Sequence, residues 1–295
     1  MATNFNVSPY YDDYSDDKLF HRILFRPAFA VQARELTQLQ TILQNQITRF
    51  GQHMFKEGSQ VIPGGIQFFP NFRYVKLASF STTAVTGLKD IELTGGTSGV
   101  VGKVIETQAA TTTSAATLFI SYSKTGSNNS SNSFSDGETL TGTNSSGTSV
   151  SAVVGTSGTV LPTDTDATGV ASAVEVEEGV YFVDGFFVKN TKQLLILEAY
   201  ETEVNARVGF TITDSFVTPE DDDSLKDNAQ GSSNVNAPGA HRLKKTLTLS
   251  KKTLTATDDS DFVELMKIEN GDVFTKVIKT DYNILEKELA RRTFD

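Results

Sequence analysis

The longest run of helical periodicity in the chain lies between residues 27 and 58. Apolar side chains recur there at steps of three or four residues, which places them on one face of a helix. They are Leu36, Leu39, Leu43, Ile47, Phe50 and Met54. A helix of about 25 residues would be roughly 37 Å long. Most of the remaining chain carries short apolar runs separated by turn residues, so the expected fold is mainly β with one long N-terminal helix.

This apolar stripe has two interpretations. It packs either on the β-structure of its own chain or on copies of itself in an oligomer. The near-heptad spacing and the uncharged Gln residues beside the stripe allow the second, although three heptads are too few to decide. Pro27 is expected before or at the start of the helix, and Gly51 and Gly58 are expected to mark its end.

Charge and composition exclude several classes of function. The net charge is −10, whereas a nucleic-acid surface needs clustered Lys and Arg. The chain has no Cys, which excludes disulfides and Cys-based metal sites. Its first residues show no basic region followed by an apolar run, and 18 consecutive apolar residues occur nowhere. We therefore expect no nucleic-acid partner, no signal peptide and no membrane span, with production and assembly in a cytoplasm.

Residues 93–160 are dominated by Thr, Ser, Gly and Asn, yet short strand candidates recur between turn clusters. This pattern predicts a small inserted β-barrel or β-sandwich, and the alternative is a disordered low-complexity insert. Later in the chain, Asp184-Gly185 and Asn270-Gly271 each predict a two-residue hairpin. A short C-terminal helix is expected after Thr280 or Asp281, and its apolar side carries Ile284, Leu285 and Leu289.

These patterns divide the chain into five predicted parts. The first is an N-terminal arm and helix for attachment or oligomerisation, and its aromatic and acidic arm docks either on its own chain or on a neighbouring subunit. A core β-domain, the inserted β-module, a polar acidic loop and a C-terminal hairpin-and-helix region follow. In this order their boundaries are 1–58, then 59–92 with 161–218, then 93–160, 219–240 and 241–295.

We find no common catalytic pattern: no nucleophile elbow, no phosphate-binding loop and no dinucleotide fingerprint. The three His residues, His21, His53 and His241, lack a second His at the spacing of a zinc helix. Carboxylate pairs such as Glu175 with Glu177 are expected by chance in a chain with 36 Asp and Glu. The chain is therefore not expected to be an enzyme or to hold a cofactor.

One weak metal candidate has the spacing of a calcium-binding loop. Positions 1, 3 and 12 of such a loop would be filled by Asp164, Asp166 and Glu175, and positions 5 and 6 by Thr168 and Gly169. Thr is a poor fit at position 5, and Val174 and Val176 indicate a strand where a calcium loop leads into a helix. Asp and Gly are also ordinary turn residues, which favours a simple turn.

The stretch FRPAFAVQARELTQLQ resembles a family of large virion proteins of tailed bacteriophages, notably of cyanophages and related myoviruses, defined by a domain of unknown function 4815. The resemblance extends from NFNVSPYYDD to the Pro-Gly-Gly turn after the helix. It continues near the C-terminus in three segments, and is weak across residues 93–160. The three segments are APGAHRLKKTLTLSKK, FVELMKIENGDV and YNILEKELARRTFD.

The resemblance implies a structural virion protein in the tail, as a baseplate or proximal tail-fibre component. Its expected partners are other tail and baseplate proteins and further copies of itself, with a homotrimer as the guess. The family supplies no catalytic residues. The alternatives are a receptor-binding fibre protein that recognises host glycan and, more remotely, a tail-associated depolymerase. The family pattern continues beyond ARRTFD, so the chain is either a short member or the N-terminal part of a longer one.

Overall fold

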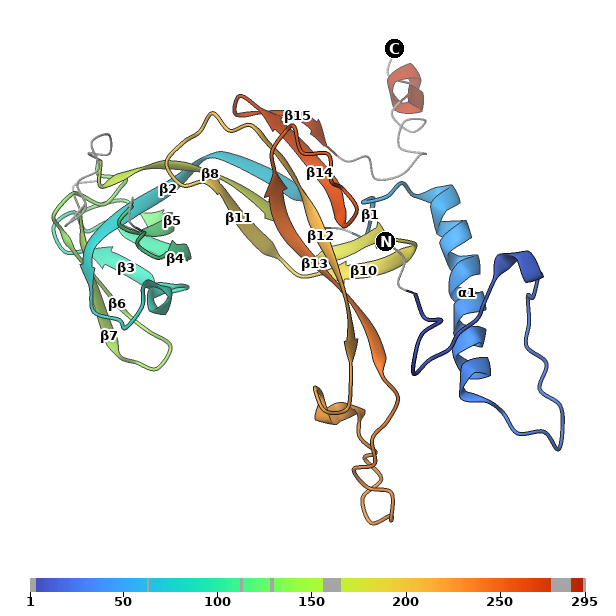
Figure 1. Cartoon of the computed structure of the whole chain (residues 1–295). Helices are drawn as coiled ribbons and strands as arrows, with labels where there is room; N and C mark the ends of the chain where they lie inside the picture. The colour runs from blue at the N-terminus through green and yellow to red at the C-terminus, as the bar shows by residue number, and fades with distance from the viewer. Residues whose placement is uncertain are drawn as a thin grey trace.

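The computed structural model describes residues 4–62, 64–111, 114–127, 130–155, 166–276 and 288–293. Within them the chain is mainly β, with one long helix, α1 (Ala33–Met54), and a short helical segment at residues 288–293. This confirms the fold class expected from the sequence. Figure 1 shows a small barrel on one side, a set of sheets in the centre, and α1 with the N-terminal arm on the other side.

Six strands form the barrel, in the order β2-β5-β4-β3-β6-β7. It closes because β7 also pairs with β2, with Leu77 opposite Val154 and Phe80 opposite Ala152. Closure leaves no open edge between these strands. The strands are β2 (Ile66–Phe80), β3 (Glu92–Gly95), β4 (Val101–Gln108), β5 (Ala116–Lys124), β6 (Thr139–Thr143) and β7 (Ser149–Val154).

The interior of the barrel is apolar because alternate residues of each strand point inward. Leu93, Leu118 and Leu140 are completely buried there, and the 3-10 helix η2 (Val85–Leu88) adds two more buried side chains. The described part of residues 93–160 is therefore an ordered β-structure, as the sequence predicts. The barrel nevertheless includes three pieces from before residue 93: the second half of β2, the 3-10 helix η2 and the first residue of β3.

Strand β2 connects the barrel to the centre of the molecule. Its residues 73–77 pair with β5 inside the barrel, and its residues 66–75 pair, with an irregularity after Phe69, with β8 (Thr168–Val176). β11 (Gln193–Glu198) extends the sheet beyond β8. A separate three-stranded sheet contains β1 (Gln60–Ile62), β9 (Gly179–Val183) and β10 (Phe186–Asn190).

A four-stranded sheet in the order β13-β12-β14-β15 completes the centre. β12 and β13 form a long hairpin that projects away from the other sheets and ends in the exposed polar loop containing η3 (Asp223–Leu225). The strands are β12 (Ala206–Val217), β13 (Arg242–Lys252), β14 (Phe262–Glu269) and β15 (Asp272–Lys276).

Both predicted two-residue hairpins are confirmed. Asp184 and Gly185 have φ of 51° and 78° between β9 and β10, and Asn270 and Gly271 have φ of 51° and 79° between β14 and β15. These positive values are what the tight turn requires and what Asp, Asn and Gly tolerate best. The β9–β10 hairpin, the first of these two, is the part of the central sheets that α1 contacts.

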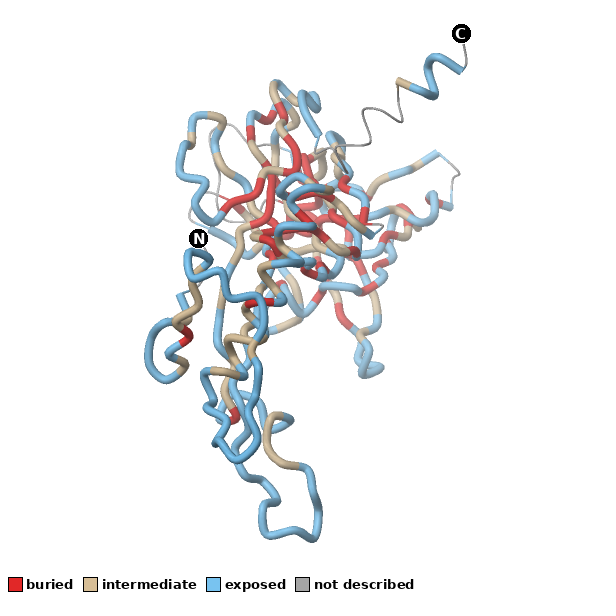
Figure 2. The backbone as a smooth tube through the Cα atoms, turned by 90° about the vertical axis from the view of Figure 1, so that its right-hand side faces the viewer, coloured by how far each residue is buried: buried red, intermediate tan, exposed pale blue. Residues whose placement is uncertain are grey.

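The main core lies between the four-stranded sheet and the strands β8 to β11. Its members include Val176, Tyr181, Leu197, Phe210 and Leu265. Tyr181 and Phe210 pack edge to face with ring centroids 4.8 Å apart. Figure 2 shows buried residues gathered in this region, whereas the arm and α1 are mostly exposed or half-buried. The core is therefore built without the long helix.

Candidate assembly surface

Helix α1 begins at Ala33 and ends at Met54, inside the predicted range of 27–58. At its start, Glu35 Oε2 accepts the backbone N–H of Gln32 at 2.8 Å, which supplies one half of a capping box. Pro27 lies before the helix. Gly51 does not end it, contrary to the sequence prediction, but lies buried in its last turn. A Cβ atom on Gly51 would come within 2.4 Å of the Phe182 ring, so this Gly permits close packing.

The side of α1 that faces the central sheets is polar. Gln44 Nε2 and Thr48 Oγ1 both donate to the carbonyl oxygen of Gly185, at 3.0 and 3.1 Å. Beyond the helix, the Phe55 ring packs on Phe182 and Phe187 of β9 and β10. Small and amide side chains thus bring the helix onto the β9–β10 turn, and the apolar stripe plays no part in this contact.

A second side of α1 carries the N-terminal arm. Thr41 Oγ1 donates to the buried carboxylate of Asp12 at 2.5 Å. Asn45 Nδ2 donates to Asp16 at 2.8 Å, and Arg49 forms an ion pair with the same carboxylate at 2.6 Å. This part of the arm packs on its own chain, which was one of its two predicted interpretations.

The arm also contacts the projecting β12–β13 hairpin. The rings of Phe5 and Tyr10 lie 6.1 and 5.3 Å from that of Phe216, and the Tyr10 hydroxyl lies 2.8 Å from Nδ1 of His241. The arm therefore joins α1 to the hairpin. His21 and His53 are exposed, in keeping with the surface role expected for them.

Ion pairs in the arm shift the ionisation of its acidic groups. The pKa of Asp13 lies below its usual value because Lys18 donates a hydrogen bond to it and adds a positive charge nearby. The pKa of Asp16 is lowered mainly by the hydrogen bond from the Tyr14 hydroxyl, and the same bond raises the pKa of Tyr14. Both carboxylates hold their contacts in the ionised form.

The apolar stripe of α1 faces solvent. Four of its six side chains have between 47% and 65% of their surface exposed, namely Leu36, Leu43, Ile47 and Phe50. Leu39 and Met54 are half-buried. Two residues that widen the stripe are covered by the chain itself: Ile42 is buried, and Phe55 packs on β9 and β10. The four exposed side chains do not pack on the chain's own β-structure, so the first interpretation from the sequence holds only for the edges of the stripe. The apolar face is outward because the two polar sides of the helix are already occupied by the central sheets and the arm.

The loop before α1 enlarges this surface. Since Asp16 pairs with Arg49 near the end of the helix, and the helix begins at Ala33, the loop runs back along the helix (Figure 1). It carries six more exposed apolar side chains: Leu19, Phe20, Leu24, Phe25, Phe29 and Val31. With the four exposed helix side chains, we estimate on the order of 500 Å² of apolar surface, worth on the order of 10 kcal/mol if covered, before the cost of association.

An apolar surface of this size is at the upper end of what a monomer usually exposes, and such surfaces mark binding sites. The six stripe residues carried the expected attachment role in the sequence. Residues 19–31 belonged to the arm and helix, 1–58, that were expected to serve attachment, but the apolar side chains of this loop were not singled out because they lack periodicity. The signal that could have found them is their density of Leu and Phe in a segment without strand or helix pattern.

The calcium candidate is not assembled by the described residues. Asp164 lies outside them. Thr168 and Glu175 both lie in β8, where seven residues of extended chain separate them by roughly 23 Å. Glu175 instead pairs with Lys192 at 2.9 Å. Across the described ranges, no three His, Asp or Glu side chains are grouped so as to hold a metal ion.

The candidate carboxylate pairs are neutralised by lysines. Lys192 lies 2.9 Å from Glu175 and 3.0 Å from Glu177, and Lys189 lies 2.7 Å from Glu178. The hydrogen bond from Lys192 lowers the pKa of Glu177. A general acid in a glycosidase needs a raised pKa, so the lowered pKa of Glu177 is the opposite of that requirement.

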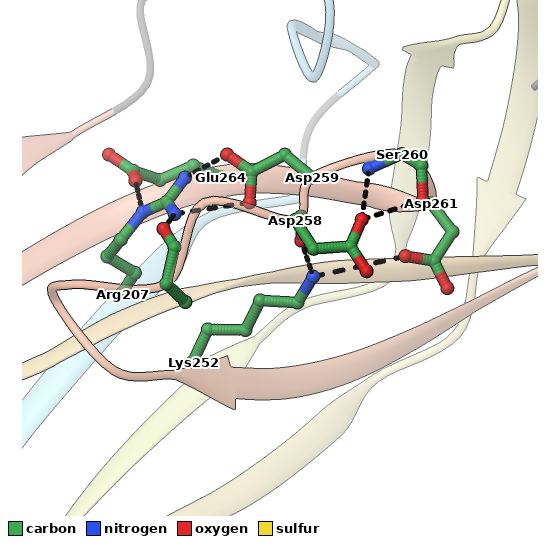
Figure 3. A network of polar contacts seen from close by, with 8 residues as sticks. Arg207, Lys252, Asp258, Asp259, Ser260, Asp261 and Glu264 are labelled. Atoms are coloured by element: carbon green, nitrogen blue, oxygen red, sulfur yellow. Dashed lines mark hydrogen bonds and ion pairs between the residues drawn. The ribbon is translucent and has the colours of Figure 1, made fainter.

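The richest polar network lies at the connection between β13 and β14 (Figure 3). Arg207 forms ion pairs of 2.5 Å with both Asp259 and Glu264 and donates to the carbonyl of Ala256. These contacts raise the pKa of Arg207 and lower that of Asp259. Lys252 contacts Asp258 and Asp261 in the same connection. Arg207 lies in β12 and Lys252 is the last residue of β13, so the network attaches this connection to both strands.

A shallow depression on the barrel has no side chains suited to catalysis or to stacking on a ligand. It is lined by Ser81, Val150 and small residues of β6 and β7, and none of its lining side chains is titratable or aromatic. The described part of the chain also contains no helix long and apolar enough to cross a membrane. The exposed face of α1 and the loop before it therefore form the strongest candidate for a functional surface.

Comparison with known protein families decides the relationship. The family model described as a domain of unknown function (DUF4815) matches residues 8–70 and 153–295. The chain belongs to the DUF4815 family. The match contains the arm, α1 and the central sheets, and it omits residues 71–152, which include most of the barrel. Searches of curated proteins and of solved structures find no match to the chain.

Proposed function

We propose that this DUF4815 chain is a structural virion protein of a tailed bacteriophage, a baseplate or proximal tail-fibre component that attaches through its N-terminal arm and α1. The observation that carries the proposal is the outward apolar face of α1 with its neighbouring loop. Such a face is stable in water only at a cost, and a constitutive assembly partner removes that cost. The sequence resemblance supplies the virion context.

The remaining architecture supports a structural part. The barrel and the central sheets have separate cores connected through β2, and the β12–β13 hairpin is braced by the arm. Rigid β-bodies of this kind suit a spacer or a base for more distal parts. Its partners would be other tail and baseplate proteins and copies of itself, with the homotrimer as the oligomer that the resemblance suggests.

Recognition of host glycan and cleavage of host polymer are less well supported. Exposed aromatic side chains, the usual contacts for sugars, gather on the arm, the loop and α1, as in Phe20, Phe29 and Phe50. The described barrel loops are instead rich in Ser, Asn and Gly. The candidate carboxylates are paired with lysines, which disfavours a depolymerase.

The test is localisation in the particle. Antibodies against the recombinant chain should label purified virions at the tail end, and peptides from the chain should copurify with infectious particles through a density gradient. A non-structural phage protein produced in the same infection serves as the control for contamination. Abundance in infected-cell lysate with absence from gradient-purified particles would refute the proposal.

A further inference from the structure

The outward stripe of α1 has the register of a coiled-coil seam. Core positions separated alternately by four and three residues run without interruption through the helix. They are Leu36, Gln40, Leu43, Ile47, Phe50 and Met54. At 3.6 residues per turn, all six lie within a sector of about 80° around the helix axis. Five of the six are apolar, as the a and d positions of a coiled coil require.

We propose that this seam is a parallel, in-register self-association surface, and that its occupant is α1 of a second copy of this chain. The inference names the partner of the surface described above and rests on the proposed structural role. Three features of the helix argue for a second copy over a different protein. They are the one polar residue in the seam, the uncharged residues on both sides of the seam, and the part of the helix surface that neither the sheets nor the arm contacts.

Gln40 is the one polar residue in the seam, and it is exposed. In a parallel, in-register pair, the two Gln40 amides meet and can donate and accept hydrogen bonds with each other. In an antiparallel pair, each amide would face an apolar residue and lose its hydrogen bonds with water. A single polar core residue of this kind specifies register and orientation at a cost in stability.

The flanks of the seam carry no Asp, Glu, Lys or Arg within α1. The positions on one side are Thr37, Gln44 and Gly51, and those on the other are Leu39, Gln46 and His53. Coiled coils that select a different partner usually do so with complementary charges at these positions. Uncharged flanks are equally compatible with an identical helix and offer a foreign partner no charge to recognise.

The space around the helix also suits an identical partner. The central sheets contact α1 through Gln44, Thr48 and Gly51, and the arm contacts it through Thr41 and Asn45. The seam lies in the remaining sector of the helix, and its flank at Gln44 and Gly51 borders the central sheets. The estimate of about 500 Å² per chain includes the loop before α1. A pair that covers both the seam and this loop would therefore bury on the order of 1,000 Å², which reaches the lower bound of a specific interface.

Disulfide trapping tests the seam directly, since the chain has no Cys of its own. Leu36→Cys should cross-link nearly completely under mild oxidation, because equivalent core positions lie within disulfide range in a parallel pair. In an antiparallel pair that aligns the whole seam, the two sites would be roughly 27 Å apart along the helix axis. Gln52→Cys, exposed on the same helix but off the seam, is the matched control and should remain unlinked.

Solution mass gives the second measurement, by light scattering over a concentration series. Wild-type protein should form an oligomer at micromolar concentration. Leu43→Asp combined with Ile47→Asp should give monomer with unchanged β-sheet circular dichroism, and Gln52→Asp should remain oligomeric. Gln40→Leu, which makes the seam fully apolar, should tighten association at least about tenfold, so the inference stays testable if the Asp variant fails to fold.

A monomeric wild type, or equal cross-linking of Leu36→Cys and Gln52→Cys, overturns the inference. If that monomer is still found in purified particles, the proposed structural role stands and a different tail protein covers the seam. If the chain oligomerises through the seam but is absent from particles, the proposed role fails and the self-association surface remains. The two outcomes are therefore separable.

Discussion

At the scale of single residues, the buried carboxylate of Glu138 looks like a functional group but serves the barrel. Its Oε2 accepts backbone N–H groups of Thr97 and Ser98 at 3.2 and 3.0 Å. Its Oε1 accepts the Ser98 hydroxyl at 3.0 Å and the Ser135 N–H at 2.6 Å. Four donors satisfy the charge and join two barrel loops. Sequence reasoning missed this residue because Ser98 lies 40 residues away and no local pattern links them.

Replacing Glu138 should therefore destabilise the barrel. Glu138→Ala leaves several buried donors without an acceptor, and each such group costs about 1–3 kcal/mol, so we expect a loss of about 3 kcal/mol or more. Urea unfolding measures this loss in the free energy of unfolding. The stability of Glu138→Gln, which keeps one acceptor oxygen, should lie between those of Glu138→Ala and the wild type. The control is Glu106→Ala, which removes a more exposed ion pair with Lys89 and should cost about 1 kcal/mol or less. Equal losses for Glu138→Ala and Glu106→Ala would contradict this role.

At the scale of elements, the sequence predicts that a helix or hairpin forms better than it predicts which side of that element packs against the rest of the chain. Periodicity predicted α1, and turn chemistry predicted the β9–β10 and β14–β15 hairpins, because both signals are local. The side on which α1 packs could not be predicted in this way. It depends on Gly185 and Phe182, which lie more than 130 residues after the helix residues they contact. An apolar stripe predicts a contact, and only tertiary structure shows whether the chain itself provides it.

The attachment of the arm to α1 should weaken in acid. The pKa values of Asp13 and Asp16 are lowered in the folded chain. The contacts of these two ionised carboxylates with α1, from Asp13 to Gln38 and from Asp16 to Arg49, therefore contribute fully above the ordinary Asp pKa of about 4. That contribution to the attachment of the arm is lost as the pH falls through the lowered pKa values of these two Asp residues in the folded chain. A dye placed by Asn6→Cys should accordingly gain mobility below about pH 4, measured by fluorescence anisotropy.

A matched variant separates release of the arm from general unfolding. Asp13→Asn combined with Asp16→Asn removes both titrating groups, so its arm should already be more mobile than that of the wild type at pH 7, and its anisotropy should change less on acidification. Circular dichroism followed in the same titration reports the β-structure. If the double variant keeps the wild-type pH profile, these two carboxylates do not hold the arm.

At the scale of the whole molecule, two cores meet at one strand. The barrel core and the central core contain different residues, and β2 contributes Val75 and Leu77 to the first and Ile66 to the second. The family match covers residues 8–70 and 153–295, so it includes the central core and leaves out most of the barrel. The sequence predicted an inserted module but could not predict that it closes onto a strand it shares with its host.

Two cores connected in this way should open separately. Leu140 is completely buried in the barrel, and Leu→Ala changes at such sites cost about 2–5 kcal/mol. Leu140→Ala should therefore speed hydrogen exchange of the amides in β3, β4, β6 and β7 by at least about thirtyfold, while β12 and β14 keep wild-type protection. Leu265→Ala, at a buried site of the central core, should give the reverse pattern.

Because β2 contributes side chains to both cores, its protection from exchange should fall near Leu77 in Leu140→Ala and near Ile66 in Leu265→Ala. Uniform acceleration across all these strands would instead make the molecule a single cooperative unit, with β2 transmitting the loss from one core to the other.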